Sequence, residues 1–156
     1  MAIDKVRDYF RGVDMEARVM EFEVSSATVE LAAQALGCAP ERIAKSLSFQ
    51  VGDAAILVVV AGDAKIDNAK FKARFATKAK MLASEETEGK IGHAVGGVCP
   101  FAVVSGVAVY LDVSLRRFET VFPACGSSNS AIELTIPQLE EYANCVDWVD
   151  VCKNWE

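Results

Sequence analysis

The sequence has a single histidine, His93, and its five cysteines form no Cys-x-x-Cys motif. Structural zinc sites need several Cys or His ligands at short spacings, so we expect no metal site. The sequence also lacks the Gly-x-Ser-x-Gly motif of serine hydrolases, the P-loop and the Gly-x-Gly-x-x-Gly dinucleotide motif. A conventional serine hydrolase, a P-loop NTPase and a dinucleotide-dependent enzyme are therefore not indicated.

No hydrophobic run is long enough to cross a membrane. The most apolar run, residues 54–61, is far shorter than the ~20 residues that a spanning helix requires. The first residues contain no apolar signal core. The cysteines are odd in number and show no paired spacing, which predicts free, reduced thiols: Cys38, Cys99, Cys125, Cys145 and Cys152. We therefore expect a cytoplasmic protein with no membrane contact.

Positive charge is scarce except in one segment. The 156 residues carry 16 Lys and Arg against 22 Asp and Glu, a net charge of −6, which excludes a protein that coats nucleic acid. Residues 65–80 nevertheless hold six basic residues and one acidic residue. This stripe could contact a phosphate backbone at one place, or it could be an ordinary solvated helix face. Its members are Lys65, Lys70, Lys72, Arg74, Lys78 and Lys80.

Length and patterning predict one α+β domain over residues 1–156. Apolar spacing indicates helices over residues 3–11, 28–36, 68–76 and 136–143, and another that begins at Ser84; Ser26 is the expected N-cap of the second. Strands are expected over residues 46–51, 55–60, 107–111, 120–122, 132–134 and 146–151, with a short one at 81–82. These elements favour a mixed, mostly antiparallel sheet that curls toward a barrel, with helices packed outside.

Lys45 is the first candidate for chemistry. It directly precedes the apolar strand expected over residues 46–51. An ammonium at the end of a buried strand is well placed to project into a cleft and to hold a phosphate or carbonyl oxygen. An ordinary surface charge is the alternative.

Two loops are the other candidates. Adjacent glycines in the segment Gly92 to Pro100 would let backbone N–H groups approach a ligand oxygen, and Pro100 would stiffen the loop. A tight turn between a helix and a strand is the alternative. The segment Cys125 to Ser130 carries short polar side chains that could recognise a sugar or an amino group, or could form a plain turn.

Four segments, in this order along the chain, resemble one known family. They are residues 43–49 (IAKSLSF), Ala61-Gly62-Asp63 with Asp67 after it, residues 96–101 (GGVCPF) and residues 131–134 (AIEL). The chain resembles, over nearly its whole length, the YbaK/prolyl-tRNA synthetase-associated domain family of trans-editing aminoacyl-tRNA deacylases. The resemblance implies hydrolysis of the ester between a tRNA, commonly tRNA(Pro), and a small wrong amino acid such as Ala, Cys, Ser or Thr. It implies no cofactor, and prolyl-tRNA synthetase is a possible partner.

The resemblance also implies roles for particular residues. Lys45 would be the essential lysine, and the backbone of Gly96, Gly97, Val98 and Cys99 would bind the reacting end of the substrate. Further substrate contacts are expected from Pro100, Ser127, Ser128, Asn129 and Ser130, and contacts to the acceptor end of tRNA from Lys70, Lys72, Arg74, Lys78 and Lys80. The chain departs from the family at two places. No histidine follows the Gly-Ser loop, which is the segment Cys125 to Ser130, and Ala102 stands where glycine is common.

Two hypotheses from other functional classes remain. The chain could be a non-catalytic module that binds tRNA or a synthetase. It could also be a thiol enzyme built on Cys99, with His93 as the group that would lower the pKa of the thiol. Because the sequence offers few candidate side chains for general acid–base catalysis, we favour attack of water on the ester without a protein general base, helped by a substrate hydroxyl.

Overall fold

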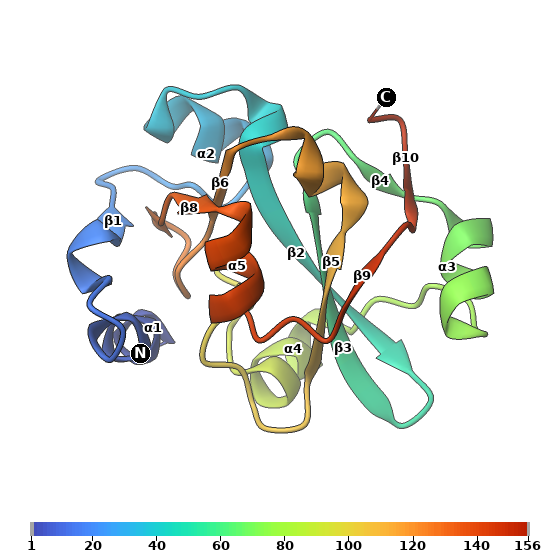
Figure 1. Cartoon of the computed structure of the whole chain (residues 1–156). Coiled ribbons are helices and arrows are strands. Elements are labelled where there is room, and N and C mark those ends of the chain that lie inside the picture. The colour runs from blue at the N-terminus through green and yellow to red at the C-terminus, as the bar shows by residue number, and fades with distance from the viewer. Residues whose placement is uncertain (1, 156) are drawn as a thin grey trace.

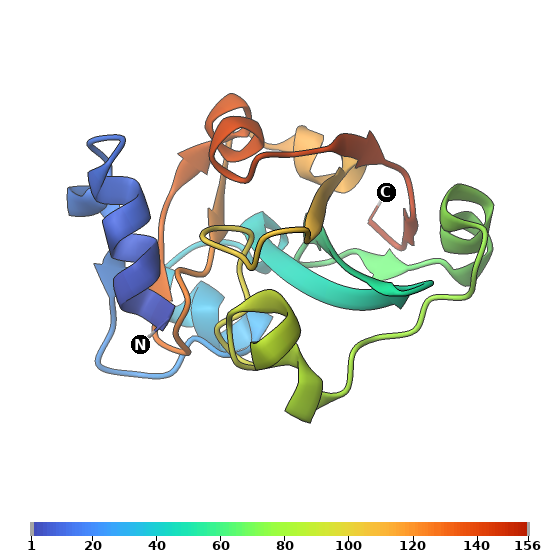
Figure 2. The ribbon, with the colours of Figure 1, turned by 90° about the horizontal axis from the view of Figure 1, so that it is seen from below.

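The computed structural model describes residues 2–155, and its centre is a curled, mixed sheet of six strands in the order β8-β6-β2-β3-β5-β9 (Figures 1 and 2). The α+β architecture with a half-barrel sheet agrees with the expectation. The six strands are β2 (Ile43–Val51), β3 (Ala54–Ala61), β5 (Ala108–Asp112), β6 (Thr120–Pro123), β8 (Leu134–Thr135) and β9 (Asp147–Val149). Two small two-stranded ladders pair β1 (Met20–Glu21) with β7 (Ser130–Ala131) and β4 (Lys65–Ile66) with β10 (Cys152–Lys153).

The β2–β3 hairpin is the longest pairing and crosses the molecule (Figure 1). Its antiparallel register runs from Ala44 opposite Ala61 to Val51 opposite Ala54, and Gly52 takes a φ of +59° in the turn. β3 lies between β2 and the parallel strand β5, and the side chains of its apolar run are buried on both faces of the sheet. A strand that is covered on both faces has a continuous apolar sequence, which is why the sequence indicated β3 clearly.

Helices surround the sheet (Figure 2). Phe10 of the first helix packs 4.8 Å from Phe101 between ring centroids, and Phe71 packs 4.8 Å from Phe49 of β2 at the far side of the molecule. The five α-helices are α1 (Ala2–Arg11), α2 (Val29–Leu36), α3 (Asn68–Phe75), α4 (Ser84–Ile91) and α5 (Ile136–Tyr142). Short 3₁₀ turns are η1 (Glu16–Arg18), η2 (Pro40–Arg42) and η3 (Val113–Arg117).

Helix ends largely follow local sequence signals. Thr135 and Gln138 form a reciprocal capping box at the start of α5, and Gly37 ends α2 with a φ of +68°. The expected cap of α2 was wrong, because Thr28 rather than Ser26 accepts the backbone N–H of Leu31. Ser26 instead donates its backbone N–H to the carbonyl of Ser128, a contact that only the tertiary structure creates.

Three strand boundaries differ from expectation. β2 begins at Ile43, so Lys45 lies inside the strand rather than before it. The expected strand 132–134 is instead two two-residue strands, β7 and β8, on either side of Ile132. The expected strand 146–151 divides as well, because β9 pairs with β5 whereas β10 pairs with β4. These divisions depend on distant partner strands, which local periodicity does not specify.

Candidate functional site

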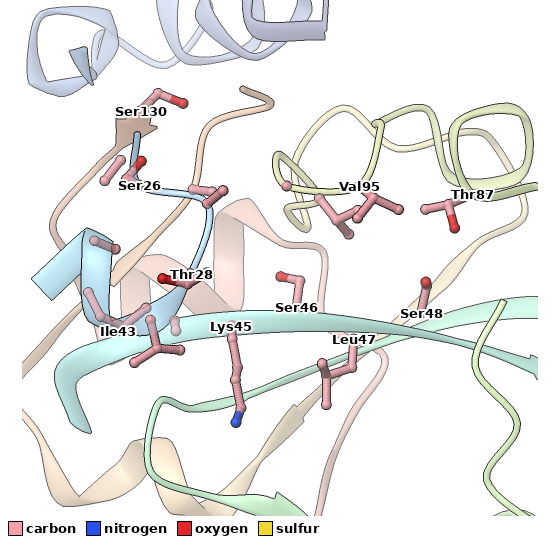
Figure 3. A pocket seen from close by; sticks show the side chains of 18 of the residues that line it. Ser26, Thr28, Ile43, Lys45, Ser46, Leu47, Ser48, Thr87, Val95 and Ser130 are labelled. Atoms are coloured by element: carbon pink, nitrogen blue, oxygen red, sulfur yellow. The ribbon is translucent and has the colours of Figure 1, made fainter. Parts of the chain in front are cut away.

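The molecule contains a cavity of about 550 Å³ between β2, the start of α2, α4 and the loop over residues 95–98 (Figure 3). The lining residues are mostly small, apolar or hydroxyl-bearing, and none of those that the structure describes is acidic. Thr28, Ile43 and Ser130 lie toward one end of it, and Ser48 and Thr87 lie toward the other (Figure 3). The lining includes Ser26, Thr28, Ala32, Ala44, Ser46, Ser48, Leu82, Thr87, Val95, Gly96, Val98, Ala124, Ser130 and Ala131.

The two faces of β2 differ in chemistry, and the cavity uses the serine face. The side chains of Ser46 and Ser48 point into the cavity, whereas Lys45 and Leu47 point away from it on the other face (Figure 3). This follows from the alternation of side chains along a strand. The spacing of Leu47 and Phe49 already places Lys45 on their face, so the sequence carried this signal.

The ammonium of Lys45 is therefore not in the cavity, although Lys45 is among its lining residues. Nζ lies 3.4 Å from the carbonyl oxygen of Gly62. Burial lowers the pKa of Lys45, and the nearby Cys152 and Asp63 act in the opposite direction. This placement differs from an ammonium that projects into the cleft. A role of Lys45 in substrate binding stays a prediction.

The edge of β2 is open at Ser46. Pairing with β6 covers Ile43 and Ala44 and ends there. Further along the same edge, the carbonyl of Ser48 accepts the N–H of Leu82, and the N–H of Gln50 donates to the carbonyl of Lys80. Between these two pairings the strand edge borders the cavity.

The loop after α4 forms the opposite wall. The N–H of Gly97 donates to the carbonyl of Ala94 at 3.0 Å, so this amide is committed to a turn. Gly96, with a φ of +96°, and Val98 line the cavity, whereas Gly97 and Cys99 lie behind it. Within residues 2–155, the N–H groups of Gly96 and Val98 have no hydrogen-bond partner. Two of the four residues whose amides the resemblance implied, Gly96 and Val98, therefore line the cavity, and Pro100 is buried outside its lining.

The Gly-Ser loop supports the Gly96–Val98 segment. A Cβ atom on Gly97 would lie 2.8 Å from the backbone of Gly126 and Ser127, so the two loops are in direct contact. Of the four polar residues expected to contact substrate, Ser130 lines the cavity. Oγ of Ser127 lies 2.8 Å from both Oδ1 of Asn129 and Oγ of Ser130, and the amide of Asn129 donates to the carbonyl of Phe22 at 2.9 Å. These bonds hold the loop in place.

Cys99 and His93 are both fully buried. Nε2 of His93 lies 2.7 Å from the carbonyl of Phe101, so this nitrogen is the donor, and burial lowers the pKa of the imidazole. Sγ of Cys99 lies 3.5 Å from the same nitrogen. Burial raises the pKa of Cys99 to about 12. A neutral imidazole and a protonated thiol argue against a thiol enzyme.

The Cys99 thiol should make stability fall at high pH. The unfolded thiol ionises near its ordinary pKa of 9.0, but the native thiol keeps its proton up to about 12. Native stability is therefore complete below pH 9 and decreases above it by about 1.4 kcal/mol per pH unit for this group. Urea unfolding of the reduced protein at pH 8, 9.5 and 10.5 measures this slope. Cys99→Ala should make this slope shallower by about 1.4 kcal/mol per pH unit, which corresponds to one proton. An unchanged slope would contradict a raised pKa for Cys99.

The predicted tRNA contacts divide into two groups. Lys70 and Arg74 form ion pairs with Asp150 and Asp147, each at 3.2 Å. Lys72, Lys78 and Lys80 are exposed, and Lys80 directly precedes Met81, which is exposed at the cavity. Contact of any of these residues with tRNA stays a prediction.

Several lining residues escaped the sequence reasoning. Ser46 and Ser48 could have been found by counting every second residue from Ala44. Thr28 and Thr87 come from two helices that tertiary packing brings to β2, and no local pattern indicates this. Within residues 2–155, no group of three metal-ligating side chains occurs, and no helix is long and apolar enough to span a membrane.

Comparison with known proteins gives a consistent result. The profile of a family described as the aminoacyl-tRNA editing domain matches residues 23–142. A protein of Bacillus subtilis (strain 168) named "Uncharacterized protein YwhH" is 55% identical over the full length of both chains. A proline–tRNA ligase of Geobacillus thermodenitrificans (strain NG80-2) is 29% identical over 86% of this chain, which spans 26% of the ligase. A crystal structure described as a candidate trans-editing enzyme for prolyl-tRNA synthetase superposes with a TM-score of 0.87 at 25% identity, covering 97% of each chain.

Proposed function

Because the chain belongs to the family of aminoacyl-tRNA editing domains, we propose that it hydrolyses the ester of mischarged aminoacyl-tRNA. The substrate in this proposal is tRNA(Pro) that carries a small wrong amino acid such as Ala, Cys, Ser or Thr. The observation that carries it is the cavity lined by Gly96 and Val98, whose N–H groups have no partner within residues 2–155, and by the open edge of β2.

The need for such an activity follows from the size of amino acids. A synthetase pocket that admits proline cannot strongly exclude smaller side chains, because one missing methylene changes binding by only ~1–3 kcal/mol. A second site that hydrolyses the wrong product restores accuracy. The cavity is lined with small side chains and has room for an aminoacyl group and part of the terminal adenosine.

In the proposed mechanism, water attacks the ester carbonyl and the tRNA hydroxyl leaves. The N–H groups of Gly96 and Val98 stabilise the negative charge that develops on the carbonyl oxygen. No carboxylate or imidazole lines the described cavity, so a substrate hydroxyl near the ester positions the water. Rigid support of the glycine loop by the segment 125–130 fixes the two donors in place.

The tRNA is held at the mouth of the cavity. Exposed Lys72, Lys78 and Lys80 meet backbone phosphates of the acceptor end, and Lys45 binds a phosphate of the terminal nucleotides on the face of β2 away from the cavity. On a chain with a net charge of −6, contact confined to this end gives weak and salt-sensitive binding.

A panel of tRNA(Pro) charged with Ala, Ser, Cys, Thr or Pro tests the proposal directly. We expect the protein to release at least one small wrong amino acid ~10²-fold or more above the uncatalysed rate, since oxyanion stabilisation alone supplies an effect of this order. Prolyl-tRNA(Pro) should be spared. Equal binding of charged and uncharged tRNA, with no ester loss above background, would instead favour a non-catalytic binding module.

A further inference from the structure

The open edge of β2 presents unpaired backbone groups to the cavity. The N–H and C=O of one residue in a strand point to the same side, and the side alternates from residue to residue. The carbonyl of Ser48 and the N–H of Gln50 point toward residues 80–82, with which they are bonded. Ser46 therefore points its N–H and its carbonyl toward the same edge, beyond the end of the β6 pairing at Ala44.

The Ser46 hydroxyl gives an independent indication of a ligand at this point. Its Oγ atom is buried and has no hydrogen-bond partner within residues 2–155. The side chain points into the cavity (Figure 3). A buried hydroxyl without a partner costs stability unless something supplies one, so a polar ligand group beside Ser46 would satisfy it.

An aminoacyl ester has the right groups for this edge. Its charged α-amino group is a strong donor that neutral backbone and hydroxyl oxygens can accept. We propose, on the basis of the proposed function, that Ser46 binds the α-amino group of the aminoacyl ester at this edge. The α-amino group donates to the carbonyl and the hydroxyl of Ser46, and the ester carbonyl accepts from the N–H groups of Gly96 and Val98 on the opposite wall.

This contact explains how the site selects its substrate. Ser46 recognises the α-amino group, which every free aminoacyl ester has. The shape of the cavity then selects among the side chains. The described lining contains no carboxylate, so neutral acceptors hold the amino group. Esters with a blocked amino group, including peptidyl-tRNA, would therefore be poor substrates.

The first test compares free and N-acetylated esters. The ester of the panel that the protein hydrolyses fastest is prepared in both forms, and each rate is divided by its uncatalysed rate. We expect N-acetylation to reduce this ratio about 100-fold, since it removes the charge and two donors and adds bulk at a packed edge. Equal ratios would overturn the contact with Ser46 and leave the proposed function intact. Absence of hydrolysis of every free ester would refute the proposed function itself.

The second test uses a matched pair of variants. Ser46→Ala removes the hydroxyl at the open edge, and Ser48→Ala makes the same change on the same face, where the carbonyl is already bonded to Leu82. We expect Ser46→Ala to reduce the discrimination between free and N-acetylated esters about 10-fold, and Ser48→Ala to change it less than about threefold. Loss of general structure would slow both esters equally. Unchanged discrimination in Ser46→Ala would contradict the contact with the amino group.

Discussion

Gly97→Ala is expected to reduce deacylation about 100-fold, although Gly97 does not line the cavity. A Cβ atom at this position would lie 2.8 Å from backbone atoms of Gly126 and Ser127, and backbone cannot move aside cheaply. The glycine loop must then shift away from the segment 125–130 and carry the N–H groups of Gly96 and Val98 with it. A displacement of about 1 Å in a catalytic group can cost this factor in rate.

Gly89→Ala provides the matched control for that result. Gly89 lies in α4, just before the same loop, and a Cβ atom there meets nothing within 4 Å. We expect normal deacylation and a stability that is equal or slightly increased, because alanine favours a helix over glycine. Single-turnover rates and urea unfolding of both variants separate the loss of activity from the loss of folding. A normal rate in Gly97→Ala would show that the close contact of the two loops does not position the donors.

Lys45→Met is expected to raise KM for the aminoacyl-tRNA about 10- to 100-fold, the range of one hydrogen bond to a charged group. The variant keeps the apolar stem and removes the ammonium, whose partner is the Gly62 carbonyl at a long 3.4 Å. Because the ammonium lies on the face of β2 away from the cavity, kcat should change less than about threefold. The effect on KM should be smaller at high salt.

Salt dependence and a conservative variant distinguish the possible roles of this lysine. Loss of one phosphate contact should lower the slope of log affinity against log salt by about 0.7, the value for a single strand. Lys45→Arg should retain most of the affinity, since it keeps the charge. A collapse of kcat at constant KM in Lys45→Met would instead place the ammonium at the reacting ester. Wild-type kinetics would remove Lys45 from the function altogether.

The fold was predictable where the chain carries its own local signals. The strand expected over residues 55–60 and the helices expected over residues 68–76 and 136–143 all appear in the structure, as β3, α3 and α5. The divisions at Ile132 and Val151 did not follow from the sequence, because pairing with distant strands decides them. The same limit applies to Ser26, whose partner Ser128 is 102 residues away.

The contacts of the loops at the candidate site did not follow from the sequence. Adjacent glycines predicted a close approach of backbone N–H groups to a ligand oxygen, but one of them, Gly97, packs against the backbone of Gly126 and Ser127 and does not line the cavity. The orientation of Lys45 was available from strand alternation, since Leu47 and Phe49 share its face. The contribution of α2 and α4 to the cavity depends on tertiary packing alone.

A crystal structure with an uncleavable analogue, in which an amide joins alanine to the 3′ position of adenosine, tests the central claim most directly. The account predicts the amide carbonyl within hydrogen-bond distance of the N–H groups of Gly96 and Val98, with the amino group of the analogue at Ser46. An analogue bound at another surface, or in this cavity with its carbonyl turned away from these amides, would contradict the account.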